Sequence, residues 1–126
     1  MSIHQEVNFN AQPERIYEAL LSSATFSKAT GAPSEISDDA GGGFSCFGGQ
    51  ITGRNIELVP NQRIVQAWRV GAWPEGLYSI VRFEFKKEGS GTRLVLDHTG
   101  FPEDNRQHLE PGWHKMYWEP LRNFLA

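Results

Sequence analysis

Apolar and polar residues alternate along most of this chain, which is the pattern of strands with one buried face. The alternation is clearest from Leu77 to Lys87, where apolar side chains occupy nearly every second position. Gly53 interrupts another such segment, and a glycine within a strand predicts a bulge or bend there. The pattern predicts six or seven strands, with the short segment 35–38 deciding the number: 3–9, 35–38, 44–47, 50–59, 63–69, 77–87 and 92–99.

Two short helices are predicted directly after the first strand. Pro13 suits the first turn of a helix over residues 13–20, because its missing N–H has no partner at that position. Ser22-Ser23 can cap a second helix that runs to Lys28. Gly31 then stops it.

The C-terminal segment changes from strand to helix spacing. Pro111-Gly112 is predicted to mark the entry of this helix, and Pro120 within it predicts a kink, since proline removes one backbone hydrogen bond. The apolar stripe, with residues three or four apart, consists of Trp113, Met116, Tyr117, Pro120, Leu121 and Phe124.

These elements predict one α+β domain over residues 1–126, a length that fits one domain and is too short for two. A curved antiparallel sheet must wrap the long C-terminal helix to bury its inner face on so few helices. The space between a curled sheet and a single helix is where a cavity can open.

Composition narrows the function classes. The formal net charge is -3 and the basic residues are scattered, which argues against a nucleic-acid partner. Cys46 is the single cysteine, as expected in a reducing compartment such as the cytoplasm. The N-terminus lacks the features of a signal peptide, and no apolar run is long enough for a membrane span. We therefore expect a soluble intracellular chain.

Aromatic residues make up 12% of the chain, and many share the predicted inner face. A mostly apolar wall with a few polar groups is the composition of a small-molecule pocket, and the alternative is that the same residues form a filled core. The predicted ligand-binding set is Phe26, Phe44, Gln66, Trp68, Ser79, Phe83, His98, Trp113 and Tyr117.

Dedicated catalytic chemistry is hard to assemble from this sequence. Asp97 and His98 are adjacent, so on a strand they point to opposite faces and cannot act as an acid–base pair. His98 faces inward, where it is either a general base or a hydrogen-bonded core histidine. Cys46 has no neighbouring cation to activate its thiol. We expect no catalytic residue and no cofactor.

Three polar residues near the C-terminal helix resemble metal ligands at first sight: His108, Glu110 and His114. Glu110 and His114 are four residues apart, but Pro111-Gly112 lies between them and makes a regular helix there doubtful. No further ligand type clusters nearby, so no metal site is predicted.

The loop 71–76 contains Trp73, which is either an exposed anchor for a protein partner or a lid packed over the sheet edge. Charged side chains on the other strand face, Glu57, Arg69 and Arg82, are predicted to form solvated ion pairs.

An ordered set of short motifs resembles the activator of heat shock protein 90 ATPase homologue family, and most closely the C-terminal domain of the eukaryotic co-chaperone. The motifs span nearly the whole chain: Gly42-Gly43-Phe44, Gly53, Leu58-Val59-Pro60, the stretch 63–69, Trp73-Pro74-Glu75-Gly76, Gly91-Thr92-Arg93-Leu94 and Pro111-Gly112-Trp113 with Tyr117. The resemblance implies the helix-grip fold of START lipid-binding domains and the birch pollen allergen family. It also implies a co-chaperone-like role in the stress response.

The leading hypothesis is a non-enzymatic binding domain. It would hold an apolar small molecule between sheet and helix, or bind a heat shock protein 90-type chaperone through its outer surface and Trp73, or both. The alternative is an enzyme of the cyclase, hydratase or hydrolase type, since the helix-grip superfamily includes such enzymes; it would act on a hydrophobic small molecule with His98 as the acid–base group. A third is a plain dimerisation or scaffold module.

Overall fold

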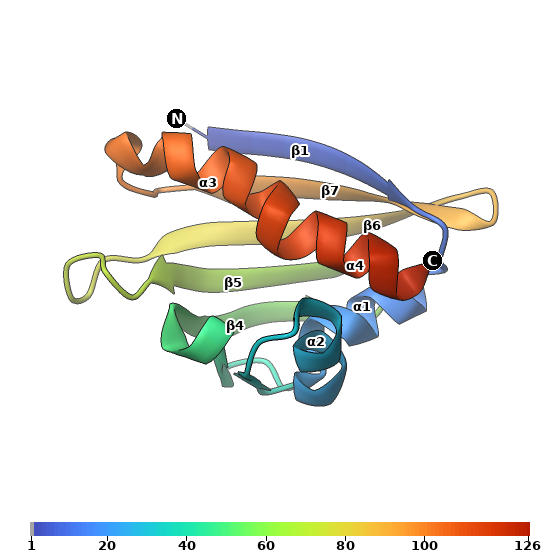
Figure 1. The fold of residues 1–126 in the computed structure, drawn as a ribbon, viewed down its shortest axis with the longest axis horizontal. Coiled ribbons are helices and arrows are strands. Elements are labelled where there is room, and N and C mark those ends of the chain that lie inside the picture. The colour runs from blue at the N-terminus through green and yellow to red at the C-terminus, as the bar shows by residue number, and fades with distance from the viewer. Residues whose placement is uncertain (1) are drawn as a thin grey trace.

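A seven-stranded antiparallel sheet forms the centre of the computed structural model, which describes residues 2–126 (Figure 1). The strands lie in the spatial order β1-β7-β6-β5-β4-β3-β2, so β1 and β2 are the edges. The predicted α+β class with a curved sheet is confirmed, and the sheet has seven strands. Their bounds are β1 (Ser2–Phe9), β2 (Ser34–Ile36), β3 (Gly43–Cys46), β4 (Ile51–Val59), β5 (Arg63–Val70), β6 (Ser79–Glu88) and β7 (Gly91–Thr99).

Both predicted short helices follow β1, as α1 (Pro13–Leu21) and α2 (Ser23–Thr30). The hydroxyl of Ser22 accepts a hydrogen bond from the backbone N–H of Thr25 at 3.2 Å, so the predicted cap of α2 is present. Gly31 ends the helix in the left-handed region, at φ 75°, where glycine carries no steric penalty.

The C-terminal helix begins earlier than predicted. A short 3-10 turn leads into α3 (Arg106–Gly112), a π-helical turn (Trp113–Trp118) and α4 (Glu119–Leu125). Gly112 has helical angles, φ −60° and ψ −39°, so Pro111-Gly112 lies inside the helix and the predicted entry point is wrong. One tertiary contact favours the extra length, because the Arg106 guanidinium donates to the Ser2 carbonyl at 2.9 Å. Within the helix, Arg106 also pairs with Glu110 at 3.4 Å.

The irregularity expected at Pro120 takes the form of the π-helical turn directly before it. Pro120 lies in the first turn of α4, where a missing N–H is tolerated. The backbone N–H of Glu119 donates to the carbonyl of His114, five residues earlier, which is π spacing.

The bulge predicted at Gly53 lies further along the same strand. The register of β4 against β5 shifts between Asn55 and Glu57. Gly53 has a different role: a Cβ atom there would collide with the carbonyl oxygen of Ala67 and lie 2.6 Å from Cζ of the Phe44 ring. Glycine at this position therefore lets the Phe44 ring close over the neighbouring strand.

The helices all cover one face of the sheet, which we call the inner face. The C-terminal helix crosses it diagonally, and α1 and α2 lie beside the C-terminal end of that helix (Figure 1). Side chains from the inner face and the helices form one buried apolar core rich in aromatic rings. Within residues 2–126, no helix has the length and apolar character needed to cross a membrane.

The other face of the sheet, the outer face, carries a continuous ion-pair network, in which the two contacts of His4 are ion pairs only when its ring is protonated. Glu57 and Arg82 belong to it as predicted, but Arg69 does not; its guanidinium donates to the carbonyls of Trp73 at 2.6 Å and Pro74 at 3.3 Å. The network runs from β4 to β1 through Glu57–Arg63 (2.7 Å), Arg63–Glu84 (3.9 Å), Glu84–Arg82 (3.7 Å), Arg82–Asp97 (2.8 Å), Asp97–His4 (2.7 Å), His4–Glu6 (2.9 Å), Glu6–Arg93 (3.1 Å) and Arg93–Glu88 (2.8 Å).

Candidate functional site

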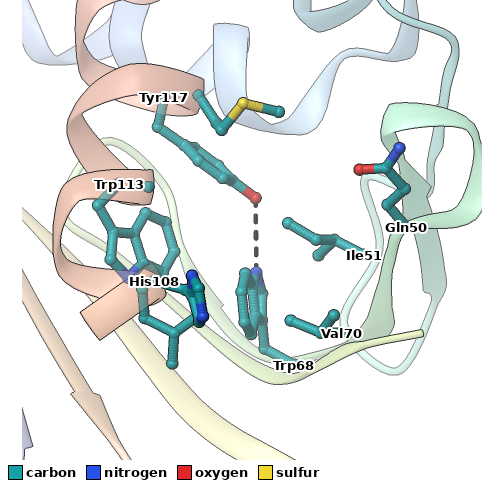
Figure 2. A pocket seen from close by; sticks show the side chains of 10 residues that line it. Gln50, Ile51, Trp68, Val70, His108, Trp113 and Tyr117 are labelled. Atoms are coloured by element: carbon teal, nitrogen blue, oxygen red, sulfur yellow. Dashed lines mark hydrogen bonds between the residues drawn. The ribbon is translucent and has the colours of Figure 1, made fainter. Parts of the chain in front are cut away.

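An apolar pocket of about 190 Å³ opens where the C-terminal helix meets the ends of two strands (Figure 2). One wall comes from the start of β4 and the end of β5, and the other from α3 and the π-helical turn. Of the predicted ligand-binding residues, Trp68, Trp113 and Tyr117 line it. The complete lining is Gln50, Ile51, Trp68, Val70, His108, Leu109, Gly112, Trp113, Met116 and Tyr117.

The π-helical turn directs three aromatic side chains toward the core, and two of them, Trp113 and Tyr117, line this pocket. Trp113, Tyr117 and Trp118 are all buried, although they are separated by four and five residues. A π turn is wider than an α turn, so it can bring both spacings onto the same face of the helix. The Trp113 ring stacks on Trp68 of β5, with centroids 5.3 Å apart, and so joins the helix to the sheet.

A second, much smaller void lies deeper between sheet and helix. Its volume is about 10 Å³, which is roughly the space that one water molecule needs. Tyr117 lines both spaces and separates them. The predicted residues Phe26, Phe44, Gln66 and Phe83 surround the void and not the pocket. The centre of the domain is thus a filled core, and the open space is displaced toward α3.

His98 and Ser79, the remaining predicted residues, lie in the core outside both spaces. The indole N–H of Trp113 donates to Nδ1 of His98 at 3.1 Å, which places the ring proton on Nε2. That proton faces the Ser79 hydroxyl at 2.8 Å, and the hydroxyl donates to the Trp68 carbonyl at 2.8 Å. Burial lowers the pKa of His98 to about 3, so the ring is neutral at physiological pH.

Trp73 packs over the sheet and does not project into solvent. Only 6% of it is exposed, its indole N–H donates to Oδ1 of Asn105 at 3.0 Å, and its ring meets Trp68 edge-on. The Arg69 bonds described above hold the loop backbone in place. The prediction of an exposed anchor is therefore wrong, and the alternative of a lid packed over the sheet is the arrangement observed.

The other reactive candidates make structural contacts. Cys46 is buried, and burial raises the pKa of its thiol to about 12. Glu110 pairs with Arg106, and residues 2–126 contain no group of three His, Cys, Asp or Glu side chains arranged to hold a metal ion.

Several pocket residues escaped the sequence analysis. The predicted helix begins at Pro111-Gly112, so it leaves out His108 and Leu109, which line the pocket. The helical spacing of Leu109, Trp113 and Met116 is the signal that extends the helix to include them. Ile51 and Val70 pair with each other across β4 and β5. Val70 continues the alternation of Ile64, Gln66 and Trp68, but it lies one residue beyond the predicted strand 63–69.

Comparisons with known proteins agree with this architecture. A relative from Homo sapiens, activator of 90 kDa heat shock protein ATPase homolog 1, is 29% identical over 114 residues, which cover 90% of this chain and 34% of the relative. The homolog from Dictyostelium discoideum is 32% identical over 119 residues, covering 94% of this chain and 31% of the relative. The chain thus spans about a third of the length of these curated relatives.

Solved structures share the whole fold. The crystal structure of a heat shock protein 90 activator from Plasmodium falciparum superimposes with a TM-score of 0.90 at 27% identity, covering 99% of this chain and 96% of that one. CalU16 from Micromonospora echinospora, at 22% identity, has a TM-score of 0.83 and covers 99% of this chain and 76% of its own; it supports the fold alone. The sequence model described as "Activator of Hsp90 ATPase homolog 1-like protein" matches residues 10–126, and the chain therefore belongs to that family.

Proposed function

We propose that this chain is a non-catalytic binding module that contacts a heat shock protein 90-type ATPase as a co-chaperone does. The family match over residues 10–126 carries this proposal, since relatives across the family are named as activators of that ATPase. Because the chain spans about a third of those curated relatives, it would supply one of their contacts and not their whole activity. The unpaired, buried Cys46 is consistent with work in the reducing cytoplasm.

We assign the contact to the outer face around Ile80. This side chain is 43% exposed, and it lies opposite Ala67 of β5 and Thr99 of β7. Tyr78, 50% exposed, precedes it by two residues. The ion-pair network borders this apolar centre through Arg82. An apolar centre with a polar rim is the usual anatomy of a protein interface.

A binding and activity assay tests the proposal directly. A heat shock protein 90-type ATPase is expected to retain the wild-type chain in a pull-down, and its rate of ATP hydrolysis is expected to change. Ile80→Glu should weaken binding by about ten-fold or more, because it places a charge in the apolar centre. Ala24→Glu is the matched control, since Ala24 is exposed on α2, on the opposite side of the sheet. Absence of both binding and rate change would remove the co-chaperone proposal.

The environment of His98 supports the non-catalytic part. An acid–base catalyst needs a pKa near the working pH and access to substrate. His98 has a pKa of about 3, is fully buried and already bonds Ser79 and Trp113. Tyr117, the other buried titratable group near the pocket, has its pKa raised well above the ordinary value by burial. Two groups poised for proton transfer do not meet here.

The apolar pocket supports a second proposal, that the module also holds a small apolar molecule. Its 190 Å³ exceeds the roughly 150 Å³ of a cavity able to hold benzene, and lies below the roughly 300 Å³ at which drug-sized pockets begin. The occupant would therefore have one ring or a short chain.

Filling the pocket tests this second proposal. Met116→Trp should block the space and abolish binding of one-ring compounds measured by native mass spectrometry. Lys115→Trp adds the same side chain at the neighbouring, exposed position of the helix and should leave binding intact. Equal binding to both variants would show that the compounds bind elsewhere.

A further inference from the structure

Two hydrogen-bond donors meet at the wall of the apolar pocket without a good acceptor. The indole N–H of Trp68 can only donate, and it points at the Tyr117 hydroxyl across 3.4 Å. That separation exceeds the usual N–H···O range of about 2.7–3.2 Å, so the bond is weak. Within residues 2–126 each of the two groups has no other hydrogen-bond partner, which leaves the hydroxyl proton of Tyr117 without an acceptor.

Both donors are held in place by the aromatic core. Tyr117 packs against Trp113, with ring centroids 4.5 Å apart, and against Phe26 at 5.5 Å. Trp68 stacks on the same Trp113 ring, which fixes its position. Figure 2 shows the hydroxyl and the indole nitrogen directed toward one another, with Ile51 beside the gap. The donors are therefore preorganised and lose little freedom when an acceptor arrives.

The surrounding surface sets the charge of a suitable ligand. No Asp, Glu, Lys or Arg lines the pocket, and the other polar side chains there are Gln50 and His108. An anion would lose its hydration without meeting a fixed positive charge, which is strongly unfavourable in an apolar site. The hydroxyl of Tyr117 also keeps its proton, because burial raises its pKa, and so remains a donor.

We propose that the apolar pocket selects a small neutral molecule bearing one acceptor oxygen, such as a ketone, aldehyde or ester on a single ring, and that this oxygen accepts from both Trp68 Nε1–H and Tyr117 O–H. The inference rests on the proposed ligand-binding role of the same pocket and adds the chemical class. The apolar remainder of the ligand would lie against Ile51, Val70 and Met116.

Three one-ring probes test the class: acetophenone, ethylbenzene and benzoate, titrated against the full chain by ligand-observed NMR. They have similar size and carry a neutral acceptor, no acceptor and a charged acceptor, respectively. Acetophenone is expected to bind about ten-fold more tightly than ethylbenzene, and benzoate more weakly than acetophenone. Two neutral hydrogen bonds of ordinary strength account for a preference of that size.

A matched pair of variants locates the effect. Tyr117→Phe removes one donor and keeps the ring, so acetophenone should weaken by about three-fold to ten-fold while ethylbenzene is unchanged. Tyr17→Phe makes the same chemical change on α1, away from the pocket, and should alter neither.

Each outcome has a distinct meaning. Equal affinity for acetophenone and ethylbenzene, unaffected by Tyr117→Phe, overturns the acceptor inference and leaves the pocket as a plain apolar site. Tightest binding of benzoate overturns the requirement for a neutral ligand. Failure of all three probes to bind, with Met116→Trp giving the same null result, removes the ligand-binding proposal and this inference with it.

Discussion

As the pH falls, the tendency of the buried His98 to take up a proton should lower the free energy of unfolding. In the folded chain burial lowers the pKa of His98 to about 3, against an ordinary value of 6.5, because Trp68, Phe101 and Trp113 enclose the ring. The adjacent Asp97 lies on the outer face, where it pairs with His4 and Arg82. The unfolded chain therefore takes up this proton first as the pH falls. The stability that depends on a neutral ring is complete above about pH 6.5 and is lost as the pH falls from there toward about 3.

The magnitude follows from the two pKa values. A pH of about 5 lies about 1.5 units below the pKa of His98 in the unfolded chain, so the unfolded ring is protonated while the folded ring is still neutral. This difference lowers the free energy of unfolding by about 2 kcal/mol relative to neutral pH. His4 acts in the opposite direction, since its hydrogen bond to Asp97 raises its pKa and stabilises the fold while the ring is charged. A variant is needed to separate the two.

Urea denaturation of wild type and His98→Asn at about pH 7 and pH 5 measures the difference. Asparagine cannot titrate there, so wild type should lose about 2 kcal/mol more than the variant between the two pH values. NMR of the wild-type histidine rings provides an independent check, because the His98 ring should remain neutral down to about pH 4. Equal pH dependence of both proteins, or a His98 ring that titrates near pH 6, would refute the reasoning.

Two further predictions concern single residues of the neighbouring strands β3 and β4. Gly53→Ala should lower the free energy of unfolding by about 1–3 kcal/mol, because the new Cβ meets the Ala67 carbonyl and the Phe44 ring. Gly43→Ala is the control, since the nearest neighbour of its new Cβ would lie 3.6 Å away, and it should lower the free energy of unfolding clearly less in the same urea titration. An equal decrease for both variants would contradict the steric explanation. Cys46, with its pKa raised to about 12, should resist a thiol reagent at mildly alkaline pH in the folded chain and react promptly in denaturant. Rapid labelling of the native protein would mean that this strand opens readily.

The strands were predictable because one face of each is buried and side chains alternate with a period of two. Burial along β6 shows the point, since Ser79, Val81, Phe83 and Phe85 are buried and the residues between them are not. The beginning of the C-terminal helix was harder to predict, because the helical spacing of Leu109, Trp113 and Met116 competes with the Pro111-Gly112 pair between them. Pro111-Gly112 has low intrinsic helix propensity, whereas burial of Leu109 in the core and the bond from Arg106 to the Ser2 carbonyl of β1 favour the helix.

The candidate site was predictable in composition but not in position. Trp68, Trp113 and Tyr117 were identified because the pattern places them on the inner face. However, a position on the inner face does not distinguish a residue that lines a pocket from one that fills the core. Ser79 and His98 also lie on the inner face, but they form hydrogen bonds inside the core. Trp73 illustrates the same limit in a loop, because its burial depends on Asn105, which is distant in sequence.

The π-helical turn at Trp113–Trp118 has a consequence for how this chain can vary in length. A π turn accommodates an additional residue between two α-helical stretches, so removal of one residue there could be absorbed by a return to α geometry, with α3 and α4 keeping their positions. A deletion within α4 cannot be absorbed by a change of helix geometry. It would rotate the following residues by about 100° around the helix axis and turn Leu125 away from the core. Single-residue deletions should therefore be tolerated by the fold at the turn and not beside it, although a shortened turn could no longer direct Trp113, Tyr117 and Trp118 inward together.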